Sequence, residues 1–386
     1  MIKRSLATVL AKLARKMPVV TLTGPRQSGK STLARAVFTG HAYVSLEHPE
    51  HRRFALAEPE GFLATHRPPV VIDEAQYAPD LFSHIQIRSD AGTRPGSYVL
   101  TGSQNFLLLN SISQSLAGRA GILHLMPFTI SELDHSRYTM DRWEDYVFKG
   151  FYPRIYDQGL DPMQWYADYI QTYVERDLRV LLNVGDLRSF HQFLTLCAGR
   201  AGQLVNLSSL GNDAGISYQT VKRWLSILEA SFIIMLLPPF HSNFNKRTIK
   251  APKLYFLDTG LAAHLLGIRS VPDLAAHFAR GALFENLFIA DLAKEFFNRG
   301  ERPPLYFFRD STGNEIDCII ERTEGITAVE TKSGSTVNED FFKGISFFRK
   351  TAGSRVKNAY VVYGGDKKQE RTAAHVVNWR QTATWM

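Results

Sequence analysis

Cysteine is scarce in this sequence, and long apolar runs are absent. Only Cys197 and Cys318 occur among the 386 residues, and they match no zinc or disulfide spacing. This excludes a disulfide-rich secreted module, and we expect both thiols to be buried in a protein of a reducing compartment. No run of about 18 apolar residues occurs, which excludes a membrane-spanning helix. Internal repeats and low-complexity tracts are also absent, so the chain should form ordinary globular domains.

The N-terminal stretch MIKRSLATVLAKLARKMP lacks the uninterrupted apolar centre and the cleavage site of a signal peptide. We therefore expect a cytoplasmic protein that does not associate with a membrane. Leu6, Val9, Leu10 and Leu13 recur at helical spacing, which would also suit a helix on a membrane surface. The favoured interpretation is a short amphipathic helix packed on the strand that follows it.

Basic residues outnumber acidic ones in this chain. The 45 Lys and Arg residues against 37 Asp and Glu give a formal net charge of +8 and an isoelectric point near 9.3. A positive balance favours polyanionic partners such as DNA, although it needs a motif to support it. At 386 residues with 45% apolar composition, the chain is too long for one core, and two or three domains are expected.

The fold class predicted from these patterns is α/β, in three parts. In residues 1–135 short apolar strands alternate with helical segments, as a parallel sheet covered by helices requires. Its candidate strands are VVTLTG, YVSLE, PVVIDEA and SYVLTGS. Residues 136–245 have a helical pattern rich in aromatic residues, with YADYIQTYVERDLRVLLNVG as the longest helix and a winged-helix-like end. Residues 246–386 return to a mixed α/β pattern.

A phosphate-binding loop follows the first predicted strand. The segment GPRQSGKS fits the P-loop pattern, in which glycines let backbone amides surround a phosphate at a helix N-terminus. Lys30 is predicted to reach the outer phosphates of ATP, and Ser31 to bind Mg²⁺. The residues predicted to contact the nucleotide in this segment are Gly24, Pro25, Arg26, Gln27, Ser28, Gly29, Lys30, Ser31 and Thr32.

Polar side chains follow two further strands. Asp73 and Glu74 end the strand PVVIDE, where Asp73 is predicted to bind Mg²⁺ through water and Glu74 to deprotonate the attacking water. Two solvated acids at a strand end are the alternative. Ser103 and Gln104 follow the strand SYVLTG and are candidates for sensing the terminal phosphate.

Arg119, in the segment LAGRAG, is a candidate arginine finger. In a homo-oligomer, such an arginine would stabilise charge at a neighbour's nucleotide during hydrolysis. A surface or ion-pairing role explains this arginine equally well. The prediction therefore depends on whether the protein assembles.

The order of GPRQSGKSTL, VVIDEAQ, YVLTGSQNFLLL and SLAGRAGILHLMPFTISEL resembles a known family. This family comprises prokaryotic AAA+ ATPases of the AAA_14 type that carry a C-terminal domain of unknown function 4143. GFYPRIY and KLYFLDTGLAAHLLG extend the resemblance over nearly the whole chain. It implies an AAA+ fold, ATP hydrolysis and a winged-helix element, but no cellular pathway.

The segment NLSSLGNDAGISYQTVKRWLSILEASFII predicts a helix-turn-helix. Gly215 would form the turn, and Ser217 would cap a second helix. That helix would bury Val221, Trp224, Leu225 and Leu228 and would expose Tyr218, Gln219, Thr220, Lys222 and Arg223. DNA reading and protein-only packing are equally compatible with this pattern.

The C-terminal part looks like a restriction-endonuclease core of the PD-(D/E)xK type. Its predicted order is a helix, three strands, a helix and a strand, with Glu285 on the first helix and Asp317 on the second strand. Glu330 and Lys332 alternate onto one face of the third strand. In such a core, carboxylates hold Mg²⁺ and the lysine helps to activate water. A surface Glu-Lys pair or an inert binding domain remains an alternative.

Three functions are compatible with these motifs. The leading hypothesis is an oligomeric AAA+ ATPase that couples hydrolysis to action on DNA. The second is an ATP-gated, metal-dependent DNA nuclease used in defence. The third is a non-catalytic, protein-binding signalling switch.

Overall fold

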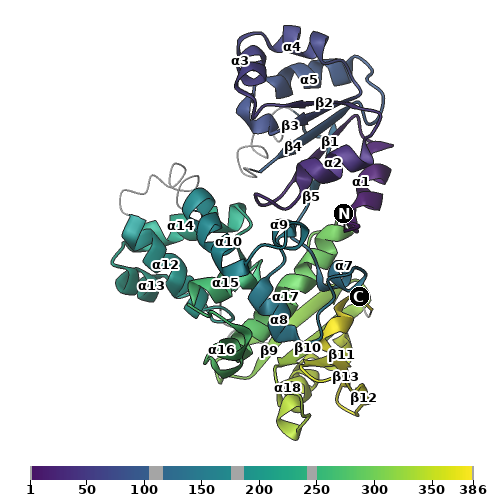
Figure 1. Ribbon diagram of the computed structural model, residues 1–386. Helices are drawn as coiled ribbons and strands as arrows, with labels where there is room; N and C mark the ends of the chain where they lie inside the picture. Colours follow the sequence, from purple (N-terminus) through teal and green to yellow (C-terminus); the bar gives the residue numbers. More distant parts are fainter. Residues whose placement is uncertain (1, 104–115, 175–186, 241–249, 385–386) are drawn as a thin grey trace. The chain divides into compact units, whose positions relative to one another are not determined.

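A computed structural model of the chain describes residues 2–103, 116–174, 187–240 and 250–384 (Figure 1). Its contacts divide the chain into two compact units. The first unit comprises Met1–Phe128, Ala230–Phe232 and Phe296–Arg302, and the second comprises Thr129–Glu229, Ile233–Glu295 and Pro303–Met386. The division at 135 and 245 predicted from the sequence stays a prediction, because packing separates two units rather than three.

A five-stranded parallel sheet forms the centre of the first unit. The strands follow the order β2-β3-β4-β1-β5, and every neighbouring pair is parallel. Their bounds are β1 Val19–Thr23, β2 Ala42–Ser45, β3 Val70–Asp73, β4 Tyr98–Gly102 and β5 Ala120–His124. The four strands predicted from the sequence are confirmed, and β5 is an additional one. Only Leu123 of β5 is fully buried, so this edge strand lacks the apolar run that marks a buried strand.

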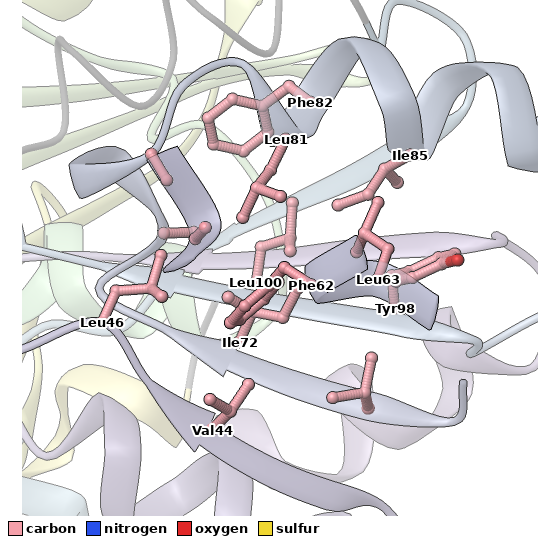
Figure 2. Close-up of a cluster of buried hydrophobic side chains, with 14 of the residues drawn as sticks. Val44, Leu46, Phe62, Leu63, Ile72, Leu81, Phe82, Ile85, Tyr98 and Leu100 are labelled. Atoms are coloured by element: carbon pink, nitrogen blue, oxygen red, sulfur yellow. The ribbon is translucent and has the colours of Figure 1, made fainter. Parts of the chain in front are cut away.

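Helices cover both faces of this sheet. They are α1 Leu6–Ala14, α2 Lys30–Val37, α3 Pro49–Ala57, α4 Pro59–Thr65 and α5 Leu81–Asp90. Because side chains alternate along a strand, Val20, Val71 and Val99 pack towards α1 and α2. Their neighbours along the strands face the helices α3 to α5, where Ile72, Leu100 and Phe82 belong to one buried cluster, drawn in Figure 2.

The N-terminal helix α1 packs on the sheet. Leu6 and Leu10 are fully buried in the cluster that contains Val20 and Leu22. Burial of a leucine side chain contributes about 1.5–3 kcal/mol, so the apolar face of α1 is used within the fold. The prediction of a packed amphipathic helix is confirmed. Within the described residues, no helix has both the length and the apolar character that crossing a bilayer requires.

The second unit begins with short helices and continues into a helical layer. These elements are α7 Ile130–Asp134, α8 Trp143–Lys149, α9 Pro153–Asp157, α10 Pro162–Tyr169, α12 Leu187–Gly199, α13 Leu207–Ala214, α14 Tyr218–Ala230, α15 Thr259–Leu265 and α16 Val271–Ala276. The strands β6 Ile234–Leu237 and β7 Lys253–Phe256 form an antiparallel pair after α14. The longest helix predicted from the sequence is described only up to Val174, and its remainder lies outside the described residues.

A six-stranded sheet completes the second unit, in the order β12-β13-β11-β10-β9-β8. The elements are α17 Arg280–Asn298, β8 Leu305–Arg309, β9 Glu315–Arg322, β10 Gly325–Lys332, α18 Lys343–Ala352, β11 Val356–Tyr363, β12 Gln369–Glu370 and β13 His375–Asn378. Strands β8, β9 and β10 are antiparallel neighbours, whereas β11 runs parallel to β10. The predicted helix-strand order is confirmed, and β12 and β13 extend it. Cys197 and Cys318 are free and buried, as expected.

Candidate functional site

The loop between β1 and α2 requires glycine at two positions. Gly24 has a φ of +145°, and a Cβ there would lie 2.2 Å from the carbonyl oxygen of Leu125. Gly29 precedes α2 with a left-handed φ of +94°. Only glycine adopts these conformations at little cost, so the loop can turn tightly into the helix. The N-terminus of α2 therefore presents unpaired amides beside the loop, as phosphate binding needs.

Arg4 links this loop to the segment that follows β5. Its guanidinium donates hydrogen bonds to the carbonyl oxygens of Ser28 (2.9 Å) and Met126 (2.6 Å). The side chain is buried, with 7% of its surface exposed. The sequence analysis missed this residue, because nothing in the local pattern distinguishes Arg4 from the other basic residues around it.

Lys30 is a buried cation at the start of α2, with 5% of its surface exposed. Its ammonium donates to the carbonyl oxygens of Gly24 (3.1 Å) and Pro25 (2.7 Å). Burial lowers the pKa of Lys30 to about 8, and the nearby Glu74 and Asp73 carboxylates only partly oppose this. A buried cation that is neutralised so incompletely favours an incoming anion.

Asp73 is held by hydroxyl groups from three different elements. Ser31 donates to both carboxylate oxygens at 2.9 Å, and Tyr43 on β2 donates to Oδ2 at 2.7 Å. Thr101 on β4 donates to Oδ1. All three donors are neutral hydroxyl groups. A carboxylate and a hydroxyl are the hard oxygen ligands that Mg²⁺ prefers, with phosphates and waters completing its shell.

Glu74 lies immediately beyond β3 in a left-handed conformation, with φ of +55°. Its Oε2 accepts a hydrogen bond from Ser103 at 2.9 Å and another from Gln76. Both bonds fall on the same oxygen. Ser103, expected to sense a phosphate, thus contacts the carboxylate predicted to activate water, and Gln104 lies outside the described residues. The sequence analysis missed Tyr43, Thr101 and Gln76. Tyr43 and Thr101 lie far from Asp73 in the sequence, and the contact of Gln76 with the nearby Glu74 depends on the direction in which its side chain points.

Arg119 is not brought to the nucleotide loop of its own chain. Its carbonyl oxygen accepts from the amide of Val19 at 3.4 Å, at the start of β1, whereas the loop follows the end of that strand. A strand of five residues places these ends roughly 16 Å apart. The guanidinium pairs with Asp90, and both side chains are substantially exposed (35% and 48%).

The residues predicted for a nuclease site lie near one another in the second unit. Glu330 and Lys332 on β10 form an ion pair at 3.2 Å. Asp317 on β9 accepts from the amide (2.8 Å) and the hydroxyl (2.9 Å) of Thr331. Burial, together with the charge of Asp317, raises the pKa of Glu330 well above its ordinary value. Glu285 reaches the same region from α17 and joins Asp317 through a further residue.

That further residue is Lys253, which the sequence analysis missed. Its ammonium lies 2.9 Å from Oε1 of Glu285 and 4.0 Å from Oδ1 of Asp317, and it pairs with Glu315. Among the described residues, no group of three or more His, Cys, Asp or Glu side chains is arranged to hold a metal ion. Lys253 lies between Glu285 and Asp317, so these two carboxylates, which the sequence predicted to bind Mg²⁺, do not fit the ion as they are placed.

Three family models match consecutive parts of the chain. The AAA domain (AAA_14) matches residues 16–134, a domain of unknown function 8612 matches residues 140–271, and domain of unknown function 4143 matches residues 280–382. The uncharacterised protein Rv2008c of Mycobacterium tuberculosis is 31% identical over 339 residues, which are 86% of this chain and 74% of that protein. The uncharacterised protein Mb2031c of Mycobacterium bovis has the same identity and coverage.

The chain belongs to the family of AAA-domain proteins that carry domain of unknown function 4143. Among solved structures, it is similar to the Walker-type ATPase PABY2304 of Pyrococcus abyssi, with 16% identity and a TM-score of 0.47. That similarity covers 69% of this chain and 96% of the archaeal chain. Membership of this P-loop family supports ATP binding and hydrolysis, and the parallel sheet with its loop agrees with this.

The helices α13 and α14 lie in the family's central domain. Gly215 ends α13 with a φ of +68°, and Ser217 caps α14 by accepting from the amide of Thr220 at 3.1 Å. Val221, Trp224, Leu225 and Leu228 are buried, as predicted from their spacing. Tyr218, Gln219, Lys222 and Arg223 are exposed, whereas Thr220 is half-buried.

Proposed function

We propose that this protein hydrolyses ATP at the P-loop, assembles as an oligomer and couples hydrolysis to action on DNA. One observation carries the proposal for the nucleotide site. Lys30 follows the carboxyl end of β1, and Asp73 and Glu74 lie at the carboxyl end of β3, on the other side of β4 in the same parallel sheet, where ligands bind in such folds. Each of them is buried, and each carboxylate is oriented by neutral donors.

The residues divide the work of hydrolysis. Lys30 exchanges its carbonyl partners for the outer phosphates, and the amides at the start of α2 bind the remaining phosphate oxygens. Ser31 and Asp73 would hold Mg²⁺, which supplies neutralisation of phosphate charge when bound. Glu74 orients a water molecule and accepts its proton, while Ser103 and Gln76 fix the direction of its carboxylate.

Two substitutions test this proposal. Lys30→Ala removes the cation that binds phosphate and should abolish nucleotide binding, whereas Glu74→Gln should leave ATP bound but nearly unhydrolysed. Equilibrium binding of a fluorescent ATP analogue and phosphate release measure the two effects. Lys16→Ala and Glu50→Gln change exposed residues of the same unit and serve as matched controls. Unchanged turnover in both site variants would refute the proposal.

An arginine finger acting between subunits is the proposed role of Arg119. Its distance from its own loop and its exposure support a role in trans. Arg119→Ala and Lys30→Ala should each be inactive alone. Mixed together, they should recover part of the activity, because a Lys30→Ala subunit supplies its intact Arg119 to the nucleotide bound by its neighbour. A mixture as inactive as its components contradicts the proposal.

DNA is the proposed partner of the second unit. The exposed Lys222 and Arg223 on a capped helix, followed by the antiparallel pair β6 and β7, support a winged-helix reading. The order α17, β8, β9, β10, α18, β11 supports a nuclease-like fold for domain 4143. We expect both modules to contribute to a DNA-binding surface. Whether domain 4143 also cleaves DNA depends on its carboxylates Glu285, Asp317 and Glu330.

Salt-dependent binding separates DNA from protein partners. Lys222→Ala with Arg223→Ala should weaken binding of a duplex and reduce the dependence of log affinity on log salt by about two ions. Lys12→Ala with Arg15→Ala is a charge-matched control at exposed positions of the first unit. If no DNA or RNA binds at low salt, the protein-binding switch becomes the better hypothesis.

A further inference from the structure

The carboxylate cluster of domain 4143 already contains a cation. Lys253 begins β7, and only 2% of its side chain is exposed. Its ammonium contacts Glu285 of α17 and Glu315 of β9 and lies 4.0 Å from Asp317 of β9. Three carboxylates from two different elements therefore surround one positive charge. Tyr255, two residues along β7, also donates a hydrogen bond to Glu285.

This arrangement is not an ordinary surface ion pair. Burial alone would lower the pKa of Lys253, but the carboxylates of Glu285, Asp317 and Glu315 hold it above its ordinary value. A lysine buried with a single partner would tend to lose its charge instead. The ammonium therefore lies where α17 meets the sheet, in contact with carboxylates from both elements.

A divalent metal ion would need the same oxygens. Mg²⁺ or Mn²⁺ binds ionised carboxylates at about 2.0–2.2 Å, and a second positive charge within a few ångströms strongly opposes it. Glu330, which would be a further ligand, is buried against Asp317 and is paired with Lys332. The Gly344 backbone leaves no free space beside it, because a Cβ there would lie 2.1 Å from Oε1 of Glu330.

We propose that Lys253 is the resident cation of this cluster, that the native domain holds no divalent metal there, and that removal of the ammonium opens a metal site. Glu285, Asp317 and Glu315 would provide its oxygen ligands. The domain would then use its nuclease-like fold to hold a partner and not to cleave it by a metal-dependent route. This inference concerns the second unit alone and stands whether or not the P-loop hydrolyses ATP.

The test measures Mn²⁺ uptake by the full-length, nucleotide-free protein, using electron paramagnetic resonance of free Mn²⁺ during titration with MnCl₂. The wild type and Lys253→Arg should show no stoichiometric site in this cluster. Lys253→Met keeps the length of the side chain and should gain one bound Mn²⁺. Its affinity for Mn²⁺ should be at least about tenfold higher than that of the wild type in this cluster. The gained site should disappear when Asp317→Asn is added, whereas Asp73→Asn, at the end of β3 in the first unit, should leave it in place.

Thermal unfolding supplies a second readout, because three carboxylates without a counter-ion destabilise Lys253→Met. Mn²⁺ should raise the melting temperature of this variant and not that of the wild type. If Lys253→Met folds only with Mn²⁺ present, the proposal is supported. A wild type that binds one Mn²⁺ and loses it on Asp317→Asn overturns it, as does a folded Lys253→Met that takes up no Mn²⁺. Cleavage of DNA by the wild type with Mg²⁺, abolished by Asp317→Asn, would overturn it as well.

Discussion

Each unit contains acidic side chains near a buried lysine, but the contacts of these charged groups differ between the two units. In the first unit, neutral hydroxyl groups hold Asp73, and Lys30 contacts carbonyl oxygens. In the second unit, Lys253 contacts the carboxylates themselves. Neutral donors orient a carboxylate without forming an ion pair with it, whereas an ammonium group forms an ion pair with the carboxylate. The same residue types thus form a candidate ligand site in one unit and an internal ion-pair cluster in the other.

The largest expected contrast lies in catalysis. Glu74→Gln removes the proposed base and should lower kcat for ATP at least about 100-fold, because general-base catalysis contributes that much or more. Glu330→Gln in the second unit should leave kcat unchanged. Steady-state phosphate release with both variants measures this difference. An equal loss in the two variants would erase the distinction between the units.

The next contrast is in stability. Lys253→Met leaves buried carboxylates without their cation and should lower the free energy of unfolding by about 3–5 kcal/mol. Lys30→Met removes a cation whose burial is poorly compensated, so the change should stay within about 1 kcal/mol of zero. Urea unfolding followed by fluorescence gives both values, and Lys253→Arg tests whether charge alone suffices. Comparable losses at the two lysines would contradict the proposed difference.

A smaller effect is expected from the hydroxyl groups around Asp73. Tyr43→Phe and Thr101→Val each remove one hydrogen bond to a charged acceptor, a loss of about 1.5–3 kcal/mol at most. We expect kcat/KM for Mg-ATP to fall by roughly tenfold for each, with the fold intact. Tyr77→Phe, which changes a tyrosine of the same unit outside this hydrogen-bond set, is the control. Full activity in both variants would mean that Ser31 alone positions Asp73.

The smallest effect should come from Arg4, which donates a hydrogen bond to the nucleotide loop. Arg4→Lys keeps a positive charge but cannot reproduce both guanidinium bonds to Ser28 and Met126. The KM for ATP should rise a few-fold while kcat changes little, since the loop loses order but no catalytic group. Lys3→Arg at the neighbouring position is the matched control. A fall in kcat with constant KM would point to a different role for Arg4.

Much of the fold follows from local pattern. The strands β1, β3 and β4 are apolar runs that end in polar residues, and α2 begins where the glycines stop. The helix-turn-helix segment shows the predicted buried face and cap. Strand β5 escaped prediction because an edge strand buries little, and β12 and β13 because they are only two and four residues long.

The parts of the candidate site that form short sequence motifs could be predicted, and the contacts between distant segments could not. The loop, Asp73 and Glu74 follow from motifs whose spacing sets their geometry. Ser103 was found as a strand-end residue, but its contact with Glu74 depends on how β3 and β4 pair. Tyr43 and Lys253 come from segments far from their partners, and only chain packing brings them within hydrogen-bonding distance.

The sequence by itself determined the parallel sheet of the first unit and the nucleotide loop, because these depend on short-range periodicity and on conformations that glycine alone adopts. The family followed from the resemblance of its ordered motifs. Only the tertiary structure decided which donors reach each carboxylate. The charge that surrounds a side chain is a sum over neighbours from separate segments, and a strand motif such as Glu330-Thr331-Lys332 contains no information about a lysine that arrives from β7.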